Sequence, residues 1–269
     1  MSIITISRGS YSRGKEVAEK VAERLNYECI SHEVIAEASK EFHVAETELE
    51  KAIHDAPPIS NWFIYGKEKY VAYIQKALLH YLQRDNVVYH GPAGHFFVKE
   101  ISHVLKVRVI TAQEARIRLV REQHGITRNE ASKLLKKLDE KRKKWSKQLF
   151  GVLTWDPKLY DLVVNIKKNT VDEAVDFICQ TAEMEDFRTT PESRKAMNDL
   201  VLSADIKAAL IDLKPDIQVS GTDGIIHVTT TVPQSKEEDL VHKMEKIAGA
   251  IQGVRQLKIH TRPSVPYGD

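Results

Sequence analysis

Cysteine is almost absent from this sequence, and that scarcity excludes two classes of protein. Only Cys29 and Cys179 occur in 269 residues, far apart in the chain. Two isolated thiols form neither the disulfide framework of a small secreted domain nor a cysteine cluster that binds a metal. Such usage is typical of a reducing compartment, so we expect a cytoplasmic protein.

Long hydrophobic runs are also missing. No stretch approaches the roughly 18 consecutive apolar residues that a transmembrane helix needs. The opening MSIITISRGSYSRGK is too polar for a signal peptide and has no small-residue cleavage site. Hydrophobic residues still make up 42% of the chain, enough for a core. We therefore expect a soluble protein with one large domain or two smaller ones.

No charge sign is in excess overall, because 40 Lys+Arg face 38 Asp+Glu. A balanced chain does not favour nucleic acid as a partner. Residues 111–150 do carry a local excess, with twelve basic and five acidic residues. Aromatic residues do not interleave with these lysines, as they do on surfaces that bind single strands. We expect most of them to form a solvated helix face.

Short β-branched segments alternate with amphipathic helical segments in the first 184 residues. We expect strands at residues 3–7, 86–89, 107–111 and 162–165, and helices at residues 15–25, 32–55, 65–84 and 171–184. Alternating strands and helices indicate an α/β domain with a mostly parallel sheet.

The pattern changes after residue 184. Residues 185–198 are polar and contain a proline, so we expect a linker. Residues 199–261 then read as helix, strand, strand, helix and strand. This order predicts a small α+β domain.

A glycine-rich motif lies between the first strand and the first helix. It is Gly9-Ser10-Tyr11-Ser12-Arg13-Gly14-Lys15, which matches G-x-x-x-x-G-K. Glycines let backbone N–H groups turn around an anion, the helix N-terminus adds partial positive charge, and Lys15 adds a full one. We expect residues 9–16 to bind the phosphates of ATP. The alternative is a glycine turn that opens an ordinary helix.

Glu16 follows the motif lysine, where a serine or threonine normally offers a hydroxyl to Mg²⁺. The carboxylate either ligates the metal, repels the nucleotide, or serves as an acidic residue in the first helical turn. We favour the last role, and the ligands of Mg²⁺ stay open.

A capping box at Thr127-Arg128-Asn129-Glu130 starts a further helix. Arg142 falls in the middle of its apolar stripe, and a guanidinium on a buried face needs an anion. That anion is either Asp139, one turn back, or a transferred phosphoryl group. Arg116 and Arg121 lie on the preceding helix. We expect Lys15, Arg116, Arg121 and Arg142 to neutralise charge during phosphoryl transfer.

These residues carry a resemblance to a known family. ITISRGSYSRGKEVAEKVAERLNY resembles the opening of the cytidylate kinase-like proteins, and VRVITAQEARIRLV resembles the start of their lid. LDEKR places Asp139 and Arg142 on their D-x-x-R pattern. Over residues 1–184 the resemblance implies a three-layer fold of the P-loop NTPase type. It also implies Mg²⁺-assisted transfer of the ATP γ-phosphate to a nucleoside monophosphate such as CMP or dCMP, or to a related small acceptor.

The acceptor side departs from the family pattern. Where relatives carry an aspartate after the first helix, this chain has Cys29-Ile30-Ser31-His32. Where they often carry Gly-Arg-Gly, it has Gly91-Pro92-Ala93-Gly94, without a charge. By position, the resemblance implies that Ser31, His32, Gly91 and Asp139 face the acceptor. An alternative function is a catalytically weak or inactive nucleotide sensor.

Residues 199–261 resemble a BON domain. The matching segments are DIKAALIDL, IQVSGTDGIIHVTTTV and IAGAIQGVRQLKI. The resemblance implies self-association or binding of a regulatory ligand through this domain. In the sensor alternative, this domain relays the nucleotide signal.

Overall fold

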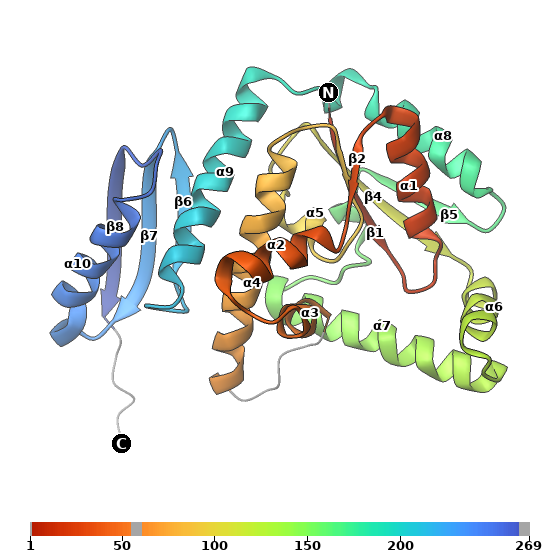
Figure 1. The fold of residues 1–269 in the computed structure, drawn as a ribbon, viewed down its shortest axis with the longest axis horizontal. Helices are drawn as coiled ribbons and strands as arrows, with labels where there is room; N and C mark the ends of the chain where they lie inside the picture. Colours follow the sequence, from red (N-terminus) through yellow and green to blue (C-terminus); the bar gives the residue numbers. More distant parts are fainter. Residues whose placement is uncertain (1, 55–60, 264–269) are drawn as a thin grey trace. The chain divides into compact units, whose positions relative to one another are not determined.

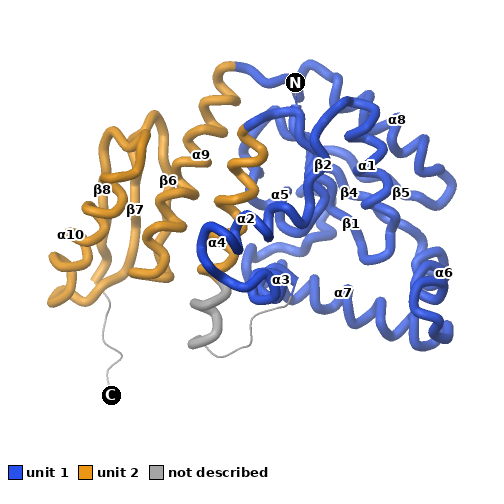
Figure 2. The backbone as a smooth tube through the Cα atoms, in the orientation of Figure 1, with its two compact units in different colours: residues 1–57, 84–190 blue, residues 58–83, 191–269 orange. Residues whose placement is uncertain are grey.

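The computed structural model describes residues 2–54 and 61–263, and these fall into two compact units (Figure 2). The first unit comprises residues 1–57 and 84–190, and the second comprises residues 58–83 and 191–269. Our sequence analysis assigns residues 58–83 to the first domain and residues 185–198 to a linker. In the structure residues 58–83 group with the C-terminal segment, and residues 191–198 are already helical.

A five-stranded sheet forms the centre of the first unit (Figure 1). Its strands are β1 (Ile3–Arg8), β2 (Glu28–Ile30), β3 (Val87–Tyr89), β4 (Val104–Thr111) and β5 (Leu162–Ile166). Their order is β2-β3-β1-β4-β5, and every pairing is parallel. The structure thus confirms the predicted α/β class. The strand β2 was not predicted, because Glu28-Cys29-Ile30 begins with an exposed charge and lacks the apolar run that marks the equally short β3.

The helices of this unit are α1 (Gly14–Leu25), α2 (Glu33–Phe42), α3 (Glu46–His54), α5 (Gly94–Phe97), α6 (Gln113–His124), α7 (Arg128–Phe150) and α8 (Val171–Ala182). One helix was expected over residues 32–55, but the chain forms α2 and α3. The break has a local cause: His43 adopts the left-handed conformation, with φ 53°, and its N–H bonds back to the Ser39 carbonyl. Such a residue ends a helix.

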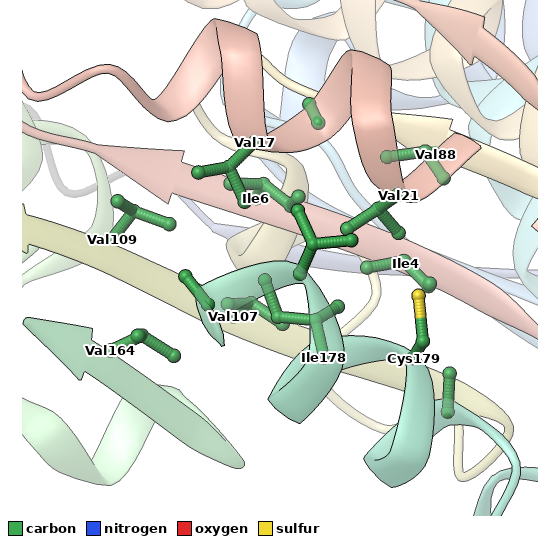
Figure 3. Close-up of a cluster of buried hydrophobic side chains, with 14 of the residues drawn as sticks. Ile4, Ile6, Val17, Val21, Val88, Val107, Val109, Val164, Ile178 and Cys179 are labelled. Atoms are coloured by element: carbon green, nitrogen blue, oxygen red, sulfur yellow. The ribbon is translucent and has the colours of Figure 1, made fainter. Parts of the chain in front are cut away.

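One face of the sheet is covered by α1 and α8, which supply the main apolar core (Figure 3). Ile4 and Ile6 of β1 meet Val17 and Val21 of α1 there, and Ile178 of α8 is fully buried. Removing a buried isoleucine side chain costs about 2–5 kcal/mol, so this face contributes strongly to stability. Its packing fixes the end of β1 against the start of α1.

The opposite face carries polar side chains as well as apolar ones. Along β1 the residues that alternate with Ile4 and Ile6 include Thr5 and Ser7, and β4 contributes Arg108. Buried strands of parallel sheets usually read as continuous apolar runs. A buried polar face therefore indicates a site.

The second unit contains α4 (Asn61–Leu82), α9 (Pro191–Leu210), β6 (Gln218–Thr222), β7 (Ile225–Val232), α10 (Glu237–Ala248) and β8 (Gln256–Pro263). After α4, the order is the predicted helix, strand, strand, helix, strand. The sheet has the order β6-β7-β8, with β6 antiparallel and β8 parallel to β7. The structure confirms a small second sheet in this region.

Helix α4 is held to the C-terminal segment by paired charges. Asp205 of α9 accepts from His80 of α4 at 2.7 Å, and Asp212 accepts from Lys69 at 2.6 Å. Burial lowers the pKa of Lys207, and the charge of Glu68 acts in the opposite direction. Since Ile74 and Leu78 of α4 are also buried, α4 is an integral part of the second unit.

In the described part of the chain, no helix is both long enough and apolar enough to cross a bilayer.

We predict that a chain ending at residue 190 is much less stable than the full chain. It lacks α9 and so exposes the apolar face of α4, where each side chain buried is worth about 1.5–3 kcal/mol. Circular dichroism should show unfolding at least about 10 °C lower, or aggregation on size-exclusion chromatography. A chain ending at residue 263 keeps every helix and strand of the second unit and is the control. Equal unfolding temperatures for the 190-residue and full chains would contradict the prediction.

Candidate functional site

The loop between β1 and α1 has a tightly turned backbone conformation. Tyr11 and Arg13 have positive φ angles of 58° and 59°, and the Ser12 hydroxyl donates to the Gly9 carbonyl at 2.8 Å. Arg13 precedes the first turn of α1 and makes no side-chain cap. Because the first N–H groups of a helix have no partner within it, this end of α1 can receive an anion.

The two motif glycines have different steric roles. A Cβ on Gly14 would lie 2.7 Å from the Cβ and Cδ of Arg8, which packs across the start of α1. A Cβ on Gly9 would meet nothing closer than 3.9 Å. Of these two glycines, packing therefore requires Gly14 but not Gly9.

Lys15 and Glu16 are exposed at the start of α1. The Lys15 ammonium lies 3.6 Å from the Glu19 carboxylate, with its side chain 66% exposed. The Glu16 carboxylate accepts two hydrogen bonds from Arg13, at 2.7 and 2.6 Å. This arrangement agrees with Glu16 as a first-turn acid, since its oxygens are engaged by Arg13.

Helices α6 and α7, which we call the lid after the family region that they resemble, share a small apolar core. Ile117 and Val120 of α6 pack with Ala131 and Leu135 of α7, and Tyr11 of the phosphate loop packs against this cluster. The Tyr11 hydroxyl also lies 2.7 Å from the Nε2 atom of His124. The phosphate loop and the lid are thus in direct contact. The predicted capping box at Thr127 and Glu130 is present.

Arg116 connects the lid to the phosphate loop. Its Nε donates to the Ser10 carbonyl at 2.8 Å, and its two terminal nitrogens donate to Asp139 at 3.0 and 2.8 Å. We considered Asp139 as the partner of Arg142, but it pairs with Arg116 instead. A bidentate pair of this kind fixes the orientation of both side chains.

Arg142 lies on the buried side of α7, as its place in the apolar stripe predicts. Its guanidinium donates to the Arg8 carbonyl at 2.8 Å and to the Ser10 hydroxyl at 3.4 Å. Burial lowers its pKa to about 10, and the charge of Arg8 acts in the same direction. Both acceptors are neutral, so its positive charge is not matched by a bonded carboxylate.

Arg108 is a site residue that sequence reasoning missed. It projects from β4 and is only 8% exposed. Its Nη1 donates to the Thr154 carbonyl at 2.9 Å, the Tyr160 hydroxyl at 3.2 Å and the Ser7 hydroxyl at 3.3 Å. The sequence could have indicated this residue, because a charged side chain is unusual within an otherwise apolar strand such as VLKVRVIT.

These arginines meet at a cavity of about 200 Å³ beside the phosphate loop. It is lined by Gly9, Ser12, Arg108, Ile110, Thr111, Arg116, Asp139, Arg142 and Trp155. Among the described residues, three guanidinium groups line it with a single carboxylate. The arrangement is that of an anion-binding site, since buried cations need a compensating negative charge.

The other residues expected at the site lie elsewhere. Arg121 is exposed on α6 and does not line the cavity. His32 is exposed, with Glu46 at 3.4 Å and Glu50 at 3.3 Å from its Nε2. The Ser31 hydroxyl donates to the His90 carbonyl at 2.8 Å. A side chain on Gly91 would overlap the hydroxyl of Tyr89, so this glycine is needed for packing.

Two histidines are buried at the carboxyl ends of the strands. Burial lowers the pKa of His90 to about 4, and Arg8 adds to the shift. Burial lowers the pKa of His95 to about 3, helped by Arg108. The Nδ1 atom of His90 has no hydrogen-bond partner among the described residues. Both rings are therefore neutral near pH 7.

Comparison with known proteins identifies the family of the chain, over a range that also includes α4 of the second unit. A model of the cytidylate kinase-like family matches residues 3–168. An uncharacterized protein from Eubacterium ventriosum ATCC 27560 is 21% identical, with a TM-score of 0.53 over 69% of this chain and 100% of that one. Shikimate kinase from Bacteroides thetaiotaomicron is 14% identical, with a TM-score of 0.44 over 68% of this chain and 99% of that one. No curated protein matches.

We predict that Gly14→Ala destabilises the protein, whereas Gly9→Ala does not. The added methyl group would collide with the Arg8 side chain close to its backbone, and overpacking of this kind costs about 1–3 kcal/mol. Chemical denaturation of the two variants without ligand measures the difference. Equal free energies of unfolding for both variants would show that Arg8 moves away at no cost.

The two buried histidines predict a pH dependence of stability. Below pH 6.5 the unfolded chain binds protons on both rings, while the folded chain stays neutral until about pH 4 at His90. The free energy of unfolding should therefore fall between pH 6.5 and 4, on the order of 1–3 kcal/mol for each histidine. Denaturant titrations at several pH values should show a flatter slope for His90→Gln and His95→Gln. His242→Gln, on the exposed side of α10, is the control, and an unchanged slope in all three variants would contradict this.

Proposed function

The chain belongs to the cytidylate kinase-like family, and we propose that its first unit transfers the γ-phosphoryl group of ATP to a small acceptor. The observation that carries the proposal is the convergence of Arg116 and Arg142 on the phosphate loop, both bonded to Ser10. This arrangement places two positive charges beside the loop that would hold the donor.

The donor phosphates would bind at the loop 9–13 and the first turn of α1. Backbone N–H groups there would surround the phosphate oxygens. Lys15 would leave its ion pair with Glu19 and bind the phosphates of the nucleotide. Mg²⁺ would supply charge neutralisation between the phosphates. No group of three His, Cys, Asp or Glu suited to a metal occurs among the described residues.

Catalysis would depend on positioning and charge. An acceptor oxygen attacks the γ-phosphorus, the bond from this phosphorus to the bridging oxygen breaks, and ADP leaves with that electron pair. Arg116 and Arg142 would stabilise the charge on the transferring group. Arg121 has no part in this scheme, because it lies outside the cavity in this structure.

The acceptor we propose is a nucleoside monophosphate such as CMP or dCMP, or a related small molecule. This follows from membership of the family and from Ser31 and Gly91 at the carboxyl ends of β2 and β3. Asp139 would act indirectly, by orienting Arg116.

A nucleotide sensor is the second candidate. Pro92 favours it, because the turn after β3 then brings no charge to an acceptor phosphate. Under this alternative the nucleotide signal would pass through the C-terminal BON-like region. A sensor binds ATP but releases no ADP in response to an acceptor.

We predict that Lys15→Ala reduces acceptor-dependent ADP release at least about 100-fold, because it removes the mobile charge at the donor phosphates. The assay is ADP release from Mg-ATP with a panel of nucleoside monophosphates. Lys20→Ala is the matched control, since Lys20 lies on the same helix but pairs with Asp172. Full turnover in Lys15→Ala would overturn the kinase proposal. ATP binding without stimulation by any acceptor would favour the sensor.

A further inference from the structure

We propose that the cavity beside the phosphate loop is an acceptor subsite for a compact oxyanion, and that Arg108 determines this specificity. The inference rests on the proposed phosphoryl transfer and names the chemistry of its acceptor. The acceptor would carry a phosphate or carboxylate group that enters the cavity and meets Arg108.

The charge balance of the cavity is the first argument. Arg116 is neutralised by its bidentate pair with Asp139. Within the described residues, the hydrogen bonds of Arg108 and Arg142 reach only hydroxyl and carbonyl oxygens. Arg108 is buried and Arg142 is half-buried, and neither guanidinium is bonded to a carboxylate among these residues. A bound anion relieves the cost of desolvating such charges.

The donor pattern of Arg108 is the second argument. All three of its hydrogen bonds to described residues use Nη1. A guanidinium has five N–H donors, so those on Nη2 and Nε remain for a ligand. Two adjacent nitrogens of this kind form the fork that binds carboxylate or phosphate in a bidentate manner.

Arg108 is also held rigidly. The Tyr160 hydroxyl that accepts from Nη1 also bonds to Ser7 at 3.0 Å and lies 3.2 Å from the Nε2 atom of neutral His95. The guanidinium carbon sits 5.5 Å from the centre of the Tyr160 ring. A pre-positioned cation loses little entropy when an anion binds.

The cavity adjoins the loop that is expected to hold the donor phosphates, but it does not reach the first turn of α1. Its lining includes Gly9 and Ser12 but none of the first-turn residues of α1. Its volume of about 200 Å³ is below the range of roughly 300–1,000 Å³ for sites that enclose whole ligands. It fits an anionic group with a few attached atoms. Trp155, which also lines the cavity, is 41% exposed to solvent. Arg108 would supply the charge that Pro92 does not.

Binding of simple anions tests the subsite without any turnover. Inorganic phosphate and acetate are titrated calorimetrically into the full chain, saturated with a non-hydrolysable ATP analogue and Mg²⁺ so that the donor site is filled. We expect Arg108→Met to weaken binding of the preferred anion at least tenfold, with the affinity for the ATP analogue changed less than twofold. Arg108→Lys keeps the positive charge but loses the two adjacent N–H donors. Its anion affinity should lie between those of the wild type and Arg108→Met.

Lys106→Met is the matched control, because Lys106 lies two residues earlier on the same strand and pairs with Asp161. Unchanged anion binding in Arg108→Met would overturn the inference, as would equal loss in Lys106→Met. If Arg108→Met fails to fold, Arg108→Lys decides, and wild-type anion affinity in that variant would overturn the inference.

Turnover then distinguishes the two sources of the oxyanion. Stimulation of ADP release by CMP or dCMP indicates a phosphate in the subsite, and stimulation by small hydroxy acids indicates a carboxylate. In either case Arg108→Lys should raise the acceptor KM at least tenfold with a smaller change in kcat. An unchanged KM would overturn the acceptor role. Loss of the proposed kinase function would appear separately, as anion binding that depends on Arg108 without ADP release from any acceptor.

Discussion

Positive charge buried beside the phosphate loop is the constraint on which the site depends. Arg142 is half-buried and bonds to the Arg8 carbonyl, while Arg108 and Arg116 reach the same cavity from β4 and α6. Of the carboxylates that the structure describes, Asp139 alone lines the cavity with these three arginines. Desolvated cations destabilise a fold unless an anion joins them. The anion that we propose for this cavity would offset that cost.

The same side chains connect local structure to function. Ser10 accepts a hydrogen bond from Arg116 through its carbonyl and one from Arg142 through its hydroxyl. Tyr11 packs into the lid core. The order of the loop and the position of the lid are thus coupled. A nucleotide that binds the loop must compete with, or reorganise, these contacts.

Sequence motifs and hydrophobic periodicity predicted much of the fold. Contacts between residues far apart in the chain could not be predicted in this way. The strand, loop and helix around Gly9 and Lys15 could be predicted, because each is determined by residues close together in the sequence. The pairing of Asp139 with Arg116 could not be predicted, since Arg142 lies one helical turn from Asp139, whereas Arg116 reaches it from the preceding helix. Arg108 was hidden because its partners, Thr154 and Tyr160, come from a loop that no periodicity places.

The discontinuous second unit has a consequence for synthesis of the chain. Helix α4 is made long before α9, its partner within that unit, because residues 83–190 lie between them. At about 5–20 residues per second, the ribosome needs roughly 5–20 s to make that stretch. During this interval Ile74 and Leu78 lack the partners that later bury them. The nascent chain therefore has a window in which aggregation or chaperone binding competes with folding.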